Sequence, residues 1–345
     1  MRPAGIRNGL VQTFLKSWSD ISGEKWSSLI LGNGASIAIH EDFAYPTLHS
    51  VADAKGLLTT TAPIFAKLGT TDFEHVLLAC WYAEHVNAAL GTPSADISAA
   101  YTEVRTALIK SVHSVHPVHA DIATDLQRAG TFASSFPTVV SLNYDLTLYW
   151  AMLLFNSAKG NWFKDAFHHG EFQTDWRYLH NPHPPATGAT LVFYPHGSLS
   201  VARDYIGDET KIAVAAGDLL ETITNRWSSG RYVPVFVSEG TSKQKVAAIR
   251  RSQYLTNVYE EVLPNVGEGL VVYGWSFDEK DQHVLDAISA NPPKRIAVSV
   301  FTGQTDGDQQ SFCHHVLKST GLSMPDTKVT FFDSRSPGCW NNPCL

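Results

Sequence analysis

Between residues 138 and 332, short runs of β-branched and apolar residues alternate with stretches whose apolar residues recur at helical spacing. This alternation is typical of a parallel β-sheet covered by helices on both faces. We expect strands at 138–142, 190–193, 211–214, 232–237, 270–273, 295–300 and 328–332. We expect helices at 145–156, 218–227, 242–262, 279–290 and 310–318. The pattern predicts an α/β fold with a doubly wound, mainly parallel, Rossmann-like sheet.

Before this region, one more strand and a helical block are expected. The strand, residues 29–31, runs directly into a glycine turn at residues 32–36. From about Pro63 to Phe136 the periodicity is helical, and Thr71-Asp72-Phe73-Glu74 has the form of a capping box. The helical block predicts an inserted subdomain. The expected parts are 1–44 (N-terminal segment, first strand and glycine turn), 45–136 (helical insertion), 137–333 (the remainder of the Rossmann-like domain) and 334–345 (a frayed tail).

Charge and cysteine content exclude several classes of protein. The chain has 345 residues and a net charge of -7, which argues against nucleic acid as a partner. Its four cysteines form no CxxC pair, so we expect neither a disulfide framework nor a metal site. No apolar run is long enough to cross a bilayer. These features predict a cytoplasmic protein without a membrane partner, and the basic residues Lys243, Lys245, Arg250 and Arg251 are interpreted as a solvated helix face.

Gly32-Asn33-Gly34-Ala35-Ser36, after the first strand, has two interpretations. Its glycines and backbone amides could cradle a pyrophosphate at the start of a helix. Asn-Gly is equally the strongest signal for a hairpin turn. The dinucleotide-binding fingerprint is incomplete, because Ile37 stands where its third glycine would fall. The motif alone therefore leaves both interpretations open.

Polar residues also follow three later strands. Asn143-Tyr144-Asp145 follows the strand at 138–142, and Asp145 is also suited to cap the next helix. Pro195-His196-Gly197-Ser198 follows the strand at 190–193, and Gly274-Trp275-Ser276 follows the strand at 270–273. Open α/β sheets bind ligands at the carboxyl ends of their strands. We therefore expect these segments to form one binding site together with the glycine turn.

Taken in order, Gly-Asn-Gly-Ala-Ser, Asp-Phe-Glu, Ser-Leu-Asn-Tyr-Asp, Pro-His-Gly-Ser and Gly-Trp-Ser resemble motifs of bacterial sirtuin-like proteins. The resemblance extends from Leu31 to about Ala290 and is to the zinc-free branch that hydrolyses NAD in anti-phage defence. It implies an NADase that converts NAD, its substrate, to nicotinamide and ADP-ribose as a regulated effector. It further implies a homo-oligomer or a partner protein of a defence system. The two cysteine pairs of the sirtuin zinc module are absent, which argues against protein deacylation.

The resemblance also implies roles for individual residues. It makes Asn143 and His196 the catalytic pair, with Asp145 in support near the nicotinamide ribose. Glu74 corresponds to the acidic residue of the family's helical region, or serves only in the capping box. We expect Asn143 to orient the ribose or the attacking water and His196 to act as general base. The implied ligand-binding residues are Gly32, Asn33, Gly34, Ser36, Gly197, Gly274 and Ser276.

Two other functions stay open. One is a module that binds NAD or ADP-ribose as a signal without turnover, and the other is an ADP-ribosyl or acyl transferase that uses NAD. Residues 160–185 are rich in aromatic residues and histidine and fit neither the strand nor the helix period. Long irregular segments of this kind are commonly lids or binding loops. We expect this segment, or packing within an oligomer, to hold the protein inactive until a signal arrives.

Overall fold

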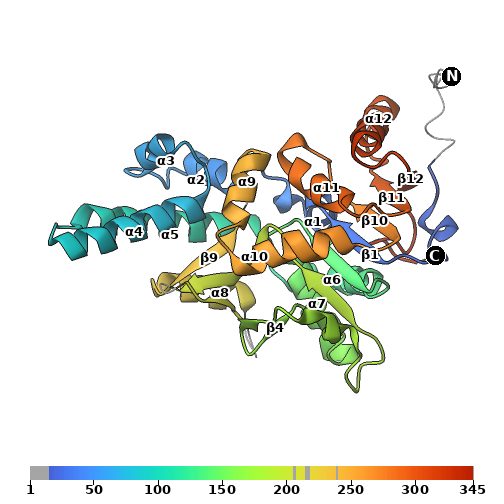
Figure 1. Ribbon diagram of the computed structural model, residues 1–345, viewed down its shortest axis with the longest axis horizontal. Coiled ribbons are helices and arrows are strands. Elements are labelled where there is room, and N and C mark those ends of the chain that lie inside the picture. The colour runs from blue at the N-terminus through green and yellow to red at the C-terminus, as the bar shows by residue number, and fades with distance from the viewer. Residues whose placement is uncertain (1–14, 205–206, 214–217, 238–239, 345) are drawn as a thin grey trace.

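The computed structural model describes residues 15–204, 207–213, 218–237 and 240–344 (Figure 1). A seven-stranded sheet forms its centre, with the strand order β12-β11-β10-β1-β2-β6-β3. Every pair of neighbouring strands in it is parallel. The strands are β1 (Ser28–Leu31), β2 (Thr138–Ser141), β3 (Phe163–Lys164), β6 (Thr190–Phe193), β10 (Gly269–Tyr273), β11 (Arg295–Val300) and β12 (Lys328–Asp333). The predicted Rossmann-like α/β fold is confirmed.

The inner strands of the sheet are almost wholly buried, because helices cover both faces of the sheet. All residues of β1, β6 and β10 are buried, as expected for near-continuous apolar strands in a parallel sheet. In register, Leu31 lies between Ser141 on one side and Tyr273 on the other. The carboxyl ends of β1, β2 and β10 therefore reach the same edge of the sheet, and the residues after them begin there.

Helices lie on both sides of this sheet. In Figure 1, α11 (Gln282–Ser289) and α12 (Asp306–Ser323) lie above it, and α6 (Ala123–Ala133) and α7 (Thr147–Lys159) lie below. The short helix α1 (Asn33–Ile39) follows β1 directly. The remaining α-helices are α2 (Leu48–Ala54), α3 (Ala62–Leu68), α4 (Phe73–Leu90), α5 (Ala95–Val115), α8 (Leu219–Ser228), α9 (Ser242–Ile249) and α10 (Gln253–Asn257). The described helices include none with the length and apolar character needed to cross a bilayer.

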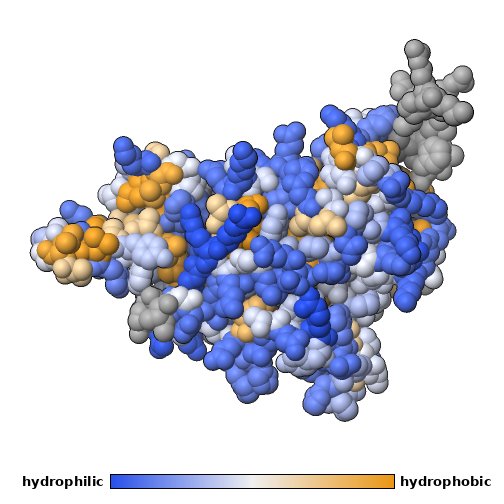
Figure 2. Space-filling view, in the orientation of Figure 1, coloured by the Kyte–Doolittle hydropathy of each residue, from blue (hydrophilic) through white to orange (hydrophobic). Residues whose placement is uncertain are grey.

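The helices predicted between β1 and β2 are present. Helices α4 and α5 pack on each other and form a hairpin that extends to the left edge of Figure 1. Apolar surface gathers at its outer end (Figure 2), where Val86 and Leu90 of α4 are exposed. The capping-box prediction is wrong, because α4 begins one residue after Asp72, whose carboxylate accepts the Glu74 N–H at 3.0 Å.

A second, antiparallel sheet was not predicted. Its order is β4-β5-β8-β7-β9, and its strands are β4 (Phe167–His168), β5 (Glu171–Phe172), β7 (Gly197–Asp204), β8 (Glu209–Lys211) and β9 (Tyr232–Phe236). The strand expected at 232–237 belongs to this sheet, as β9, rather than to the parallel one. Of the strand expected at 211–214, only Lys211 lies in a strand, the end of β8 in this same sheet, and Val214 lies outside the described residues. Segment 160–185 is not wholly irregular either: it contains β3, β4, β5 and a 3-10 helix at Trp176–His180.

Two further expectations are corrected. The helix expected at 242–262 is three pieces, α9, α10 and a π-helix at Val258–Val262, and the Ser252 hydroxyl caps α10 by accepting the Leu255 N–H at 3.1 Å. The tail is not frayed over its described residues. Trp340 is buried, and its indole N–H donates to the carbonyl of Ala35 at 2.8 Å. The tail therefore packs on α1 beside the glycine turn.

Candidate functional site

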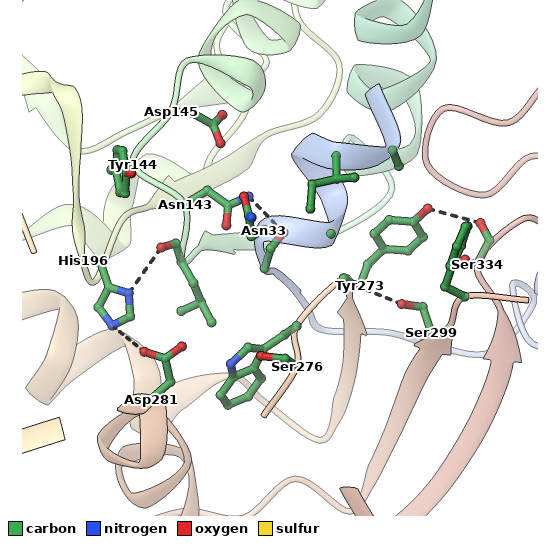
Figure 3. Close-up of a pocket in the computed structure, with 18 of the residues that line it drawn as sticks. Asn33, Asn143, Tyr144, Asp145, His196, Tyr273, Ser276, Asp281, Ser299 and Ser334 are labelled. Carbon is green, nitrogen blue, oxygen red and sulfur yellow. Dashed lines mark hydrogen bonds and ion pairs between the residues drawn. The ribbon is translucent and has the colours of Figure 1, made fainter. Parts of the chain in front are cut away.

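A cavity of about 950 Å³ opens at the carboxyl edge of the parallel sheet (Figure 3). Loops that follow six of the seven strands of this sheet contribute to its lining. Those of β1, β2, β6, β10, β11 and β12 supply, among others, Asn33, Asn143, His196, Ser276, Phe301 and Ser334. The predicted convergence of strand ends on one site is therefore observed for the glycine turn, the Asn143 segment, His196 and the Gly274 segment.

The glycine turn is the N-terminus of α1 and not a hairpin, because Gly32 is the N-cap of that helix. A Cβ at Gly32 would lie 2.5 Å from Trp275 Cα and 2.6 Å from the Gly274 carbonyl oxygen. The Gly34 N–H donates to that same carbonyl at 2.8 Å. Gly274 has a φ of +70°, a conformation that glycine adopts readily. The glycines thus allow the loops after β1 and β10 to touch on the cavity floor.

Asn143 is held by two hydrogen bonds from its amide nitrogen. Nδ2 donates to the carbonyl of Gly32 at 2.9 Å and to Ser36 Oγ at 3.0 Å. Among the described residues, the carboxamide oxygen has no hydrogen-bond partner. Since Asn143 lines the cavity, this oxygen can accept a hydrogen bond from a ligand hydroxyl or from water.

Asp145 has both carboxylate oxygens engaged. Oδ2 accepts from Ser36 Oγ at 2.6 Å, and Oδ1 accepts from the Thr147 N–H at the start of α7 at 2.8 Å. Asp145 lines the cavity, whereas Ser36 is buried behind it. Asp145 therefore bonds the first N–H of α7, but the N-cap position expected for it is taken by Leu146. Asp145 also couples α1 to the end of β2.

Tyr144 forms part of the cavity wall between Asn143 and Asp145. Its ring stacks on Phe236 of β9, with ring centroids 4.9 Å apart, and its hydroxyl lies 3.0 Å from that of Tyr45. Tyr45 also lines the cavity. The second sheet and the segment between α1 and α2 thus both reach this end of the cavity.

His196 is buried, and both of its ring nitrogens contact the protein. Nδ1 lies 3.2 Å from the Leu142 carbonyl oxygen, and Nε2 lies 2.9 Å from His283 Nε2 and 3.9 Å from Asp281 Oδ1. Burial is the main cause that lowers the pKa of His196 far below its usual range. Burial also lowers the pKa of His283, to about 4. Both imidazoles are therefore neutral near pH 7.

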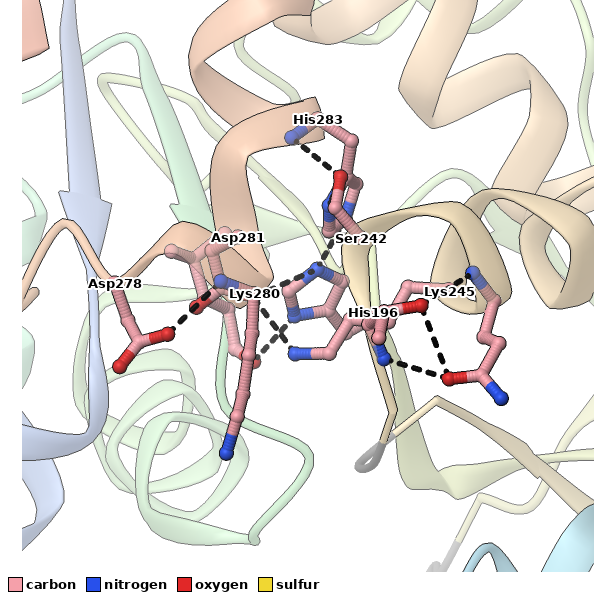
Figure 4. Close-up of polar contacts among 10 residues, drawn as sticks. His196, Ser242, Lys245, Asp278, Lys280, Asp281 and His283 are labelled. Carbon is pink, nitrogen blue, oxygen red and sulfur yellow. Dashed lines mark hydrogen bonds and ion pairs between the residues drawn. The ribbon is translucent and has the colours of Figure 1, made fainter. Parts of the chain in front are cut away.

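Lys245 corrects the interpretation of the basic residues as a solvated face. Its side chain is buried, lines the cavity, and donates from Nζ to Asp281 Oδ1 at 2.7 Å (Figure 4). Asp281 has a lowered pKa despite the opposing effect of its burial, because the adjacent Lys245 ammonium stabilises the carboxylate. The cavity thus has a buried ion pair next to His196.

Three predicted features lie elsewhere. Gly197 does not line the cavity; it begins β7 with a φ of +75°, and a Cβ there would collide with the Val235 carbonyl. Glu74 lies 3.8 Å from Arg203 Nη1 and does not line the cavity either. Residues 160–185, all described, contribute no lining residue, so the expectation of a binding loop or lid gains no support from this arrangement.

Several lining residues escaped the sequence analysis. Asp281 is in the cavity wall and His283 lies behind it. The only sequence signal for these two residues is their position five and seven residues after Ser276. The tail contributes Arg335, Asn341 and Asn342, for which the sequence offered no signal beyond a run of polar residues.

No curated protein matches this chain. One family model does, the domain of unknown function DUF4917, over residues 29–340. The matched region begins in β1 and ends at Trp340, so it includes all seven strands of the parallel sheet and most of the tail. The chain belongs to the DUF4917 family.

Proposed function

We propose that the protein binds NAD in the cavity and hydrolyses it to nicotinamide and ADP-ribose. The observation that carries the proposal is the position of Asn143. Its carboxamide is fixed by Gly32 and Ser36, and its free oxygen lies in the same cavity as the glycine turn and Gly274. A volume of about 950 Å³ is at the upper end of the range for ligand pockets, which suits a ligand as large as a dinucleotide.

The strand order supports an extended ligand. From β2 through β1, β10 and β11 to β12, the cavity presents Asn143, the glycine turn, Gly274 with Ser276, Ser299, and Ser334. Five neighbouring strands span about 19 Å at a spacing of about 4.8 Å. We place the nicotinamide ribose at the β2 end, the diphosphate over the glycine turn and Gly274, and the adenosine toward β11 and β12.

Cleavage of the bond between nicotinamide and ribose develops positive charge on the sugar. A fixed acceptor such as the Asn143 oxygen can orient a ribose hydroxyl or the attacking water as that charge develops. His196 is a weaker base than an ordinary histidine, because its pKa is lowered and its Nε2 faces His283. We therefore assign the larger effect on turnover to Asn143 and a smaller one to His196.

The setting of this activity is part of the proposal. Four free cysteines, three of them buried, fit a reducing compartment, and we place the protein in the cytoplasm. The resemblance to NAD-hydrolysing sirtuin-like proteins supports a regulated role in anti-phage defence, as a homo-oligomer or with a partner protein of the same system.

The test is to incubate the purified full chain with NAD and to measure nicotinamide, ADP-ribose and bound NAD. We expect Asn143→Ala to lower turnover by about 10²- to 10³-fold, the usual cost of losing one preorganised group at the reacting centre. Asn291→Ala, at an exposed asparagine, is the matched control. Saturable binding with intact NAD would instead identify a binding module, and ADP-ribose attached to protein would identify a transferase. If the wild type neither binds nor consumes NAD, the proposal is wrong.

A further inference from the structure

Three side chains with metal-binding atoms converge beside the cavity, although they come from distant parts of the chain (Figure 4). His196 follows β6, Asp281 ends the 3-10 helix Glu279–Asp281, and His283 lies in the first turn of α11. One nitrogen or oxygen atom of each lies within 4.8 Å of the corresponding atoms of the other two. The two Nε2 atoms are 2.9 Å apart, and His196 Nε2 is 3.9 Å from Asp281 Oδ1.

Each of the three side chains is also oriented by a second polar group. His196 Nδ1 faces the Leu142 carbonyl at 3.2 Å, and His283 Nδ1 faces Ser242 Oγ at 3.3 Å. Asp281 Oδ1 accepts from Lys245 Nζ at 2.7 Å. Metal-binding histidines almost always have their outer nitrogen on such an oxygen, and metal-binding carboxylates are hydrogen-bonded in turn.

We propose that His196, Asp281 and His283 form a binding site for a divalent transition-metal ion of the zinc class, with the remaining coordination positions open to the cavity. Two imidazoles and one carboxylate are a recurrent three-ligand set for such ions. His196 and Asp281 line the cavity, so a ligand in it could reach the ion.

The charges around the site select the class of ion. Lys245 compensates the charge of Asp281, so the cluster offers little net negative charge. Mg²⁺ and Ca²⁺ depend on several oxygen ligands and are disfavoured here. Zn²⁺ and Co²⁺ bind well to neutral imidazole and tolerate a single carboxylate. The ammonium of Lys245 opposes a further positive charge, so its removal should strengthen metal binding.

The alternative is a hydrogen-bond chain without metal. In it, the Ser242 hydroxyl donates to His283 Nδ1, His283 Nε2–H donates to His196 Nε2, and His196 Nδ1–H donates to the Leu142 carbonyl. This chain satisfies every nitrogen of the two rings. In this alternative the three side chains bind no metal ion, whereas the proposal requires that they bind one. Metal uptake therefore distinguishes the two.

The inference does not depend on NAD, and metal uptake tests it directly. The full chain, stripped with a chelator, is dialysed against Zn²⁺, Co²⁺ or Mg²⁺, and bound metal is measured by elemental analysis. We expect about one Zn²⁺ or Co²⁺ per chain, visible absorption bands for the Co²⁺ form, and no Mg²⁺. His283→Gln and Asp281→Asn should each weaken Zn²⁺ binding at least about tenfold, the minimum cost of disturbing a metal's surroundings.

The matched control is His314→Gln, at an exposed histidine of α12, which should bind Zn²⁺ as the wild type does. Circular dichroism shows whether each variant is folded, and if His283→Gln is not, Asp281→Asn decides the assignment. A wild type that retains no Zn²⁺ overturns the proposal, as does unchanged affinity in a folded His283→Gln or Asp281→Asn variant. NAD turnover does not enter the result, so failure of the proposed hydrolysis would leave this test unaffected.

Discussion

Ser36 Oγ lies 2.6 Å from Asp145 Oδ2, although the two residues are 109 positions apart in the chain. The same hydroxyl accepts the amide N–H of Asn143 at 3.0 Å. One buried serine thus ties the helix after β1 to the loop after β2. Asn143 and Asp145, which line the cavity, both depend on this contact with Ser36 for their position.

Removal of this hydroxyl should destabilise the protein. Ser36→Ala leaves a buried carboxylate oxygen without its donor, and hydrogen bonds to charged groups contribute about 1.5–3 kcal/mol. We expect a loss of that size in the free energy of unfolding, measured by urea denaturation. Ser157→Ala, whose hydroxyl bonds an exposed helix carbonyl, is the control. If the two variants have the same free energy of unfolding, the buried Ser36 hydrogen bond contributes no more to stability than the exposed one of Ser157.

Gly32→Ala should disrupt the cavity floor, because the added methyl group would overlap Trp275 and the Gly274 carbonyl. Overpacking of this kind typically costs about 1–3 kcal/mol and displaces the backbone. We expect lower thermal stability and at least a tenfold loss of NAD affinity by calorimetry. Gly321→Ala, in α12 with nothing within 4 Å, should instead stabilise slightly, as alanine does in a helix. A Gly32→Ala variant with wild-type affinity would argue against the placement of the diphosphate.

Glu74 should make the protein less stable as pH rises. Burial is the main cause that raises its pKa to about 8, while the same carboxyl ionises near pH 4.3 in an unfolded chain. Between these values the folded state holds a proton that the unfolded state releases, so rising pH favours unfolding. Glu74→Gln should remove the contribution of Glu74 and gain on the wild type by up to about 1.4 kcal/mol per pH unit. A smaller dependence of the same sign should remain, because burial also raises the pKa of Asp72, to about 7. Urea denaturation at pH 5 and pH 8 measures the difference.

The exposed Glu260 provides the control for Glu74. Glu260→Gln should follow the wild type at both pH values, because an exposed carboxyl has nearly the same surroundings in the folded and unfolded chains. If Glu74→Gln also follows the wild type, then Glu74 is ionised in the folded protein through its contact with Arg203.

Trp340→Ala should unfold the region around the glycine turn. The Trp340 ring lies 5.7 Å from that of Tyr273 at the end of β10, and its N–H holds the first turn of α1. Truncation of a buried tryptophan typically costs about 3–5 kcal/mol. We expect this loss in denaturant unfolding, and a smaller one for Trp340→Phe, which keeps a ring but not the donor. Leu322→Ala, at an exposed position, should change little.

Much of the parallel sheet could be predicted from the sequence because its strands are continuous apolar runs. The bounds expected for β6 and β11 are those observed. Strand β7 was missed because serines alternate with apolar residues in it. Ser198 and Ser200 are nevertheless buried, and their hydroxyls lie 3.1 Å apart. Their burial depends on the strands and helices around β7 and cannot be predicted from the alternation within the strand itself.

The candidate site, like the sheet, could be predicted only in part. Asn143 and the glycine turn follow adjacent parallel strands, so topology alone brings them to one edge. Asp281 and His283 were missed, and Lys245 was assigned to a solvated face, because the three meet only where α9 packs on α11. Helix packing of this kind is not encoded in spacing along the chain. The expectation of no metal site rested on spacing along the chain, and such spacing does not reveal a cluster like His196, Asp281 and His283, which forms only in the folded chain. Metal binding by this cluster is a proposal, and the metal-uptake experiment decides between it and that expectation.

The central position of β1 has a consequence for synthesis of the protein. One neighbour, β2, begins at residue 138, but the other, β10, begins only at residue 269. During synthesis, the whole second sheet leaves the ribosome before β10 does. Until then, one edge of β1 has no strand to pair with. Unpaired strand edges invite wrong pairing, and such distant contacts form slowly. We expect this interval to be when the chain most needs a chaperone.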